Sequence, residues 1–137
     1  MISKVFLDSN IIFSIAYSNK INKLNDIFLL QEYKQIEIFI SELVKQEVIR
    51  NIQIKKSENL QILKELLLKT KILKNITTDL NYPEITKLPI NYKIILTTAI
   101  SYRMDFFITG NTKDFNPLYF RKIDNTVILK PNDFLNK

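Results

Sequence analysis

The sequence predicts an α/β fold: a three-layer α/β/α sandwich with a central, mostly parallel sheet. Short apolar, β-branched segments alternate along the chain with segments of helical period, which is the pattern of a parallel sheet covered by helices on both faces. The length of 137 residues suits one compact domain. No linker or internal repeat divides the sequence, so we expect residues 1–137 to form a single domain.

The first elements are predicted from an apolar run and from two helical patterns. Residues 4–8 are expected to form a strand buried on both faces. Residues 9–20 follow as a helix, with Ser9 or Asn10 in position to cap it. Residues 22–33 have an amphipathic helical period, and this apolar helix could pack on the core or form the interface of a homodimer.

The middle of the chain repeats the alternation of strand and helix. Residues 35–41 alternate and are rich in isoleucine, as expected for a second strand. Ser41 is a good N-cap for a helix over residues 41–52. Leucines at helical spacing predict a further helix over residues 57–70, and residues 71–77 fit a short strand.

The last part of the chain contains two more expected strands. Residues 78–88, which include one proline and precede another, are expected to form a loop or short helix. Residues 91–104 read as a buried helix, followed by strands over residues 105–109 and 125–130. The closing residues 131–137 begin with proline, which favours the first turn of a short helix.

The composition restricts the chemistry that is available. The chain contains no cysteine and no histidine, which excludes thiolate and imidazole metal sites and the commonest general base. Any metal would be held by oxygen ligands, which favours Mg²⁺ or Mn²⁺. The absence of cysteine fits a reducing compartment. No segment reads as a signal peptide or approaches the roughly 18 apolar residues of a membrane span, so we expect a cytoplasmic protein with no membrane partner.

The charge gives a weaker indication. The net charge of +6, from 20 basic and 14 acidic residues, is a modest bias toward a polyanionic partner. An ordinary lysine-rich surface explains it equally well.

Two carboxylates stand at positions that need an explanation. Asp8 lies at the carboxyl end of the first strand, where it either projects into the crevice beyond the sheet as a metal ligand or caps the following helix. Glu47 lies at the edge of the apolar stripe formed by Leu43, Val44 and Val48. A glutamate there must be paired, hydrogen-bonded or bound to a cation, and a salt bridge to a lysine is the alternative to a metal.

Gly110 is the only glycine in the chain, and it directly follows an expected strand. We expect it to let the backbone turn sharply, with a positive φ. This turn brings Asn111 and Asp114 into the same crevice as the first strand's end. Asp114 then either ligates a metal or caps the short turn that follows, whereas Asp105 begins the strand at the opposite edge and is excluded from the site.

Four segments in this order resemble a PIN domain: VFLDSNII, SELVKQEVIRN, IILTTAISYRMDFFITGNTKDF and TVILKPNDFL. The resemblance spans nearly the whole chain and implies a PIN-like fold. Proteins of this family are small α/β nucleases, and many are the toxins of bacterial and archaeal toxin–antitoxin pairs. The resemblance therefore implies cleavage of single-stranded RNA and an antitoxin protein as a partner.

The family typically arranges four acidic residues around one or two Mg²⁺ or Mn²⁺ ions. By resemblance Asp8 is the first of these and Glu47 the second. The position of the third falls on Tyr92, and the triplet that usually ends in the fourth acid reads TGN, with Asn111 in its place.

The resemblance thus implies a catalytic and metal-binding set of Asp8, Glu47 and Asp114. Water molecules fill the remaining positions around Mg²⁺, and Asn91 and Asn111 are expected to hydrogen-bond these waters.

Three functions are compatible with these residues. The first is a metal-dependent endoribonuclease whose Lys93 and Lys113 contact RNA phosphates. The second is a PIN-like module that has lost its chemistry and binds RNA or a protein partner. The third is a small flavodoxin-like signalling domain, in which Glu47 and the closing segment PNDFL have no role.

Overall fold

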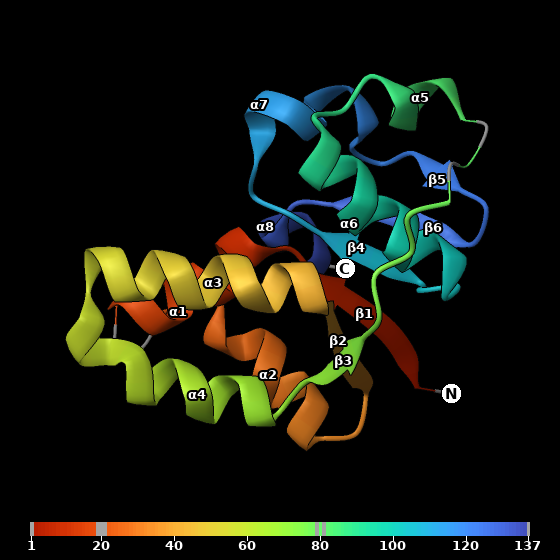
Figure 1. The fold of residues 1–137 in the computed structure, drawn as a ribbon. Helices are drawn as coiled ribbons and strands as arrows, with labels where there is room; N and C mark the ends of the chain where they lie inside the picture. The colour runs from red at the N-terminus through yellow and green to blue at the C-terminus, as the bar shows by residue number, and fades with distance from the viewer. Residues whose placement is uncertain (1, 19–21, 79, 81, 137) are drawn as a thin grey trace.

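The computed structural model describes residues 2–18, 22–78, 80 and 82–136, so the last two residues of the helix predicted over 9–20 and part of the loop predicted over 78–88 lie outside the described residues. In the described part, six strands form one sheet in the order β3-β2-β1-β4-β6-β5 (Figure 1). The strands are β1 (Ser3–Leu7), β2 (Ile36–Ser41), β3 (Lys71–Leu73), β4 (Phe106–Ile108), β5 (Lys122–Ile123) and β6 (Thr126–Leu129).

Helices connect nearly all of these strands. The α-helices are α1 (Ser9–Ser18), α2 (Asn25–Glu32), α3 (Glu42–Lys55), α4 (Leu60–Leu68), α5 (Pro83–Thr86), α6 (Ile90–Ser101), α7 (Thr112–Phe115) and α8 (Pro131–Leu135). Two short 3₁₀ segments, η1 (Ser57–Asn59) and η2 (Asn116–Leu118), precede α4 and follow α7.

The sheet is parallel except at one edge. β1 pairs in parallel with β2 and β4, β2 with β3, and β4 with β6, whereas β5 pairs antiparallel with β6. From β1 the chain first moves outward through β2 to β3, then returns to the other side of β1 at β4. This reversal places the crevice that parallel sheets use for ligands at the carboxyl ends of β1 and β4.

Helices cover both faces of the sheet. Figure 1 shows α1 to α4 grouped on one side of the strands, with α5 and α6 on the other. Val5, Phe6 and Leu7 of β1 are fully buried between these layers, and the rings of Phe6 and Phe107 stack with their centroids 5.5 Å apart. The predicted three-layer α/β fold with a mostly parallel sheet is therefore confirmed.

Most element boundaries agree with the sequence pattern, and the differences have local causes. Ser41 caps α3 as predicted, since its hydroxyl accepts a hydrogen bond from the Val44 amide at 3.2 Å. Strand β5 was not predicted because it contains only two residues, and it is defined by its antiparallel pairing with β6. The segment expected to be a loop or short helix contains the single turn α5.

Helix α2 packs on the core through one face. Ile27 and Phe28 are buried, whereas Leu29 and Tyr33 are 43% and 73% exposed. The core contact predicted for this amphipathic segment is present. Of the helices in the described ranges, none is both long and apolar enough to cross a membrane.

Candidate metal and active site

The site is built around the carboxylate of Asp8, which follows the last residue of β1 and is fully buried. Its backbone amide donates to the Ile108 carbonyl at 3.0 Å, so the end of β1 is tied to β4. The Oδ1 atom accepts a hydrogen bond from the Ser9 amide at 2.8 Å. The Oδ2 atom accepts from Thr109 Oγ1 at 2.8 Å and from Asn10 Nδ2 at 3.1 Å.

Three donors therefore stabilise a charge that has no access to water. Burial raises the pKa of the Asp8 carboxyl, and the hydrogen bonds from Thr109, Ser9 and Asn10 act in the opposite direction. The hydrogen bond from the Ser9 amide ties the Asp8 side chain to the first residue of α1, in line with the alternative of a helix cap, and a role as metal ligand stays a prediction.

Thr109 and Asn10 extend this network and were not predicted as site residues. Thr109 Oγ1 also accepts from Asn10 Nδ2 at 3.2 Å and from the Asn111 amide at 3.1 Å. The Thr109 carbonyl accepts from the Tyr119 hydroxyl at 2.9 Å. The position of Thr109 at the end of a predicted strand, level with Asp8, was the one available signal.

The prediction of a positive φ at Gly110 is wrong, because no glycine in the described chain has one. The amide of Gly110 donates to Asn10 Oδ1 at 2.8 Å. A Cβ atom at this position would lie 3.2 Å from the same oxygen. The glycine is thus explained by the close approach of the Asn10 side chain to the backbone.

Glu47 faces the same region from α3. Its Oε1 atom is buried and has no hydrogen-bond partner among the described residues. Neither of the two ion pairs found in that part of the chain includes Glu47, so the predicted alternative of a lysine salt bridge is not observed. Burial raises the pKa of the Glu47 carboxyl and the charge of Asp8 raises it further, whereas the charge of Arg50 and a side-chain hydrogen bond from Ser9 lower it.

Asp114 and Asn111 form a second pair at the mouth of the site. Asn111 caps α7, since its Oδ1 accepts from the Asp114 amide at 3.3 Å. Its Nδ2 donates to Asp114 Oδ2 at 3.0 Å. The expectation that Asp114 might cap this turn is wrong, because the amide side chain of Asn111 does so and leaves the Asp114 carboxylate at the cleft.

Tyr92, in the first turn of α6, lies close enough to these carboxylates for their charges to act on its hydroxyl. Its ring packs edge-on against Phe115, with centroids 5.8 Å apart at 63°. Burial raises the pKa of its hydroxyl, and the charges of Asp8, Glu47 and Asp114 raise it further. The charges of all three predicted acidic residues therefore act on Tyr92, which stands where the resemblance places the third acid.

A cleft of about 440 Å³ opens over this arrangement. Its lining includes four of the predicted residues, Glu47, Asn111, Lys113 and Asp114, whereas the fully buried Asp8 is not among the lining residues. The other lining residues are Ser9, Asn10, Phe13, Asn51, Lys55 and Tyr92. Lys55 was not predicted, and its ammonium lies 5.4 Å from the centre of the Phe13 ring.

Three residues lie away from this cleft. Asn91 is exposed in the first turn of α6, and neither Asn91 nor Lys93 is among the lining residues. Asp105 lies at the opposite end of β4, where its Oδ2 accepts from the Lys4 amide at 2.8 Å. Its exclusion from the site is confirmed.

Two carboxylates of the site, those of Asp8 and Glu47, could hold a divalent cation. No three acidic side chains within the described ranges gather closely enough to hold a metal. Mg²⁺ is commonly bound through only one or two carboxylates, with water and substrate phosphates completing its shell. The buried, unpartnered oxygen of Glu47 beside the charge of Asp8 is the kind of acceptor that such a cation satisfies.

Solved structures of toxin–antitoxin complexes have the same fold. A chain in the crystal structure of VapBC2 from Rickettsia felis bound to a promoter DNA fragment matches with a TM-score of 0.66 and 19% identity, over 93% of this chain and 98% of that one. A chain of DNA-bound VapBC from Salmonella typhimurium matches with a TM-score of 0.68 and 18% identity, over 96% and 99%.

A third match is to a toxin–antitoxin complex from Klebsiella pneumoniae, with a TM-score of 0.55 and 25% identity, over 90% of this chain and 95% of that one. No protein-family model and no curated protein matches the sequence. The structural matches cover nearly the whole chain, and they confirm the PIN-like fold that the sequence resemblance implied.

The account of Gly110 predicts an effect that depends on Asn10. Replacing Gly110→Ala should lower the free energy of unfolding by about 1 kcal/mol, because the new methyl group presses on an oxygen held by hydrogen bonds. In an Asn10→Ala background the same change should be neutral or stabilising by about 0.5 kcal/mol, since alanine restricts the unfolded chain. Chemical denaturation of the four proteins measures both effects, and an equal loss in both backgrounds would contradict the account.

Proposed function

We propose that this protein is the toxin of a toxin–antitoxin pair and acts as a metal-dependent endoribonuclease on single-stranded RNA. The observation that carries the proposal is the buried oxygen of Glu47 that lacks a partner beside the buried charge of Asp8. The fold shared with VapBC complexes supports an antitoxin protein as the partner.

The metal we propose is Mg²⁺ or Mn²⁺, which Asp8 and Glu47 would hold, with Asp114 contacting it only through water. Such an ion lowers the pKa of a bound water and stabilises negative charge on a phosphate. The chain supplies only oxygen ligands here, which suits these hard cations.

The other residues of the cleft position the substrate and the carboxylates. Thr109 and Asn10 fix the orientation of Asp8 through their hydrogen bonds to Oδ2. Asn111 holds the Asp114 carboxylate in the same way. Lys113 and Lys55 line the cleft and present positive charges to the RNA phosphates.

A second function, a PIN-like module that binds RNA or a protein without cleaving it, is favoured by one observation. Tyr92 and Asn111 occupy the positions where the resemblance leads us to expect carboxylates, and the Tyr92 ring is packed on Phe115. The site then has fewer negative charges with which to retain a cation. Cleavage and metal dependence separate the two functions.

Cleavage of a single-stranded RNA should require Mg²⁺ or Mn²⁺ and should stop in chelator. Asp8→Asn and Glu47→Gln should each reduce the rate by about 100-fold or more, because each removes a charge that holds the ion. Glu37→Gln is the matched control, since Glu37 lies on β2, is paired with Lys71 of β3 and does not line the cleft. Cleavage by the parent that persists in both variants would refute the proposed site.

Asn111→Asp should change stability with opposite signs in the absence and presence of metal. Without metal the new carboxylate replaces the amide that donates to Asp114, so two negative charges meet and the folded state loses about 2 kcal/mol. With Mg²⁺ the added charge strengthens binding, and the metal-induced rise in melting temperature should exceed that of the parent.

The matched control for this change is Gln35→Glu, which adds one charge at an exposed position before β2. Thermal unfolding of the three proteins in chelator and in Mg²⁺ measures the effect. If Asn111→Asp responds to Mg²⁺ no more than the parent does, the cleft is not a cation site and the binding module becomes the better account.

A further inference from the structure

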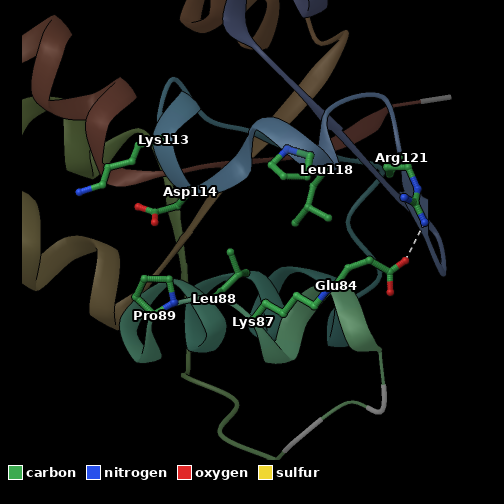
Figure 2. A pocket seen from close by; sticks show the side chains of 9 residues that line it. Glu84, Lys87, Leu88, Pro89, Lys113, Asp114, Leu118 and Arg121 are labelled. Carbon is green, nitrogen blue, oxygen red and sulfur yellow. Dashed lines mark hydrogen bonds and ion pairs between the residues drawn. The ribbon is translucent and has the colours of Figure 1, made fainter.

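A second cavity adjoins the candidate site. It has a volume of about 410 Å³ and lies between α5 with the residues that follow it and the segment of α7 and η2 (Figure 2). Lys113 and Asp114 line both this cavity and the candidate cleft. A linear polymer that is bound beside Lys113 and Asp114 can therefore extend from one cavity into the other.

The cavity is lined by apolar side chains on both walls and by charged side chains at its edges. Leu88 and Leu118 are 8% and 4% exposed, and Figure 2 shows both pointing into the gap between the two walls. Pro89 and Pro117 extend this apolar surface. Leu88 and Pro89 thus face Pro117 and Leu118 of η2 across the gap, and apolar groups on both walls can contact the faces of a nucleobase.

Basic side chains outnumber acidic ones in the lining of this cavity. Lys87, Lys113 and Arg121 line the cavity, together with the acidic Glu84 and Asp114. Arg121 Nη2 lies 2.8 Å from Glu84 Oε2, so this exposed pair offsets one positive charge while holding the guanidinium at the edge of the cavity. Lys87 and Arg121 lie on the two walls, one before Leu88 and the other after η2.

We propose that this cavity is a subsite for single-stranded RNA that continues from the candidate cleft, a proposal that rests on the proposed function. One base lies between the two apolar walls, with Leu88 and Pro89 on one side and Pro117 and Leu118 on the other, and the neighbouring phosphates contact Lys87 and Arg121. Basic side chains along a groove follow the phosphates of a single strand without sequence readout.

Another cavity among the described residues has a different chemistry. It lies between α3 and α4, is lined mainly by Ile49, Leu67, Leu68 and Ile72, and shares no residue with the cleft. Lys64 stands at its edge and serves as a control lysine outside the proposed path of the RNA.

The test measures binding of a short, labelled, single-stranded RNA to the full chain by fluorescence anisotropy in chelator, over a range of salt concentrations. Lys87→Gln and Arg121→Gln should each weaken binding by about three-fold or more, and each should reduce the salt slope by about 0.7, the value for one lost phosphate contact on a single strand. Glu84→Gln should tighten binding, because it releases Arg121 from its pair. Lys64→Gln should leave both the affinity and the slope unchanged.

Unchanged salt slopes in Lys87→Gln and Arg121→Gln, or the same loss in Lys64→Gln, would overturn the subsite. Retained RNA binding in these variants with lost binding of an antitoxin would also overturn it and assign the cavity to a protein partner. RNA binding with the expected variant effects but no cleavage would support the subsite while refuting the nuclease. RNA cleavage by the parent, together with RNA binding by Lys87→Gln and Arg121→Gln that equals the parent's, would refute the subsite while supporting the nuclease. A parent that binds no RNA would refute both.

Discussion

The buried carboxylate of Asp8 is the constraint on which the site depends. Placing a charge at the end of the central strand is costly unless donors surround it. Here the donors come from the first turn of α1 and from Thr109 at the end of β4, so one charge joins two strands and a helix. The close approach of Asn10 to Gly110 follows from the same network.

Glu47 makes this arrangement incomplete. It adds a second carboxylate near Asp8, and burial and the Asp8 charge both disfavour its ionised form. Its Oε1 finds no donor in the described part of the protein. A cation between the two carboxylates would offset both charges and bind this oxygen. The proposal of a metal therefore rests on these two side chains as well as on the fold.

The site differs from the family pattern by replacing charge with aromatic and amide groups. The charges of the three carboxylates act on the Tyr92 hydroxyl, and Asn111 donates its amide to Asp114 at a position where the resemblance implies a carboxylate. Under the proposed function, fewer carboxylates would make a weaker metal site, whose coordination RNA phosphates would help to complete. The adjoining cavity beside Lys113 is consistent with a larger share of substrate binding by the protein itself.

The order of elements could be predicted, because strand ends and apolar stripes are visible in sequence, whereas a shared site for Asp8 and Glu47 was implied by the resemblance to PIN domains. The roles of Thr109 and Asn10 could not, since their hydrogen bonds join residues about a hundred positions apart. The φ of Gly110 was mispredicted because glycine is needed here to leave room for the Asn10 side chain, and not to let the backbone adopt a positive φ. Sequence spacing also could not show that Asn111, and not Asp114, caps α7.

Titration of Mn²⁺ into the protein by calorimetry tests the central claim, that Asp8 and Glu47 bind a divalent cation. The account predicts saturable binding by the parent and affinity reduced by about 10-fold or more in Glu47→Gln. Asp105→Asn, at the opposite end of β4, should bind as the parent does. No saturable binding by the parent, or equal affinity in the parent and Glu47→Gln, would contradict the account.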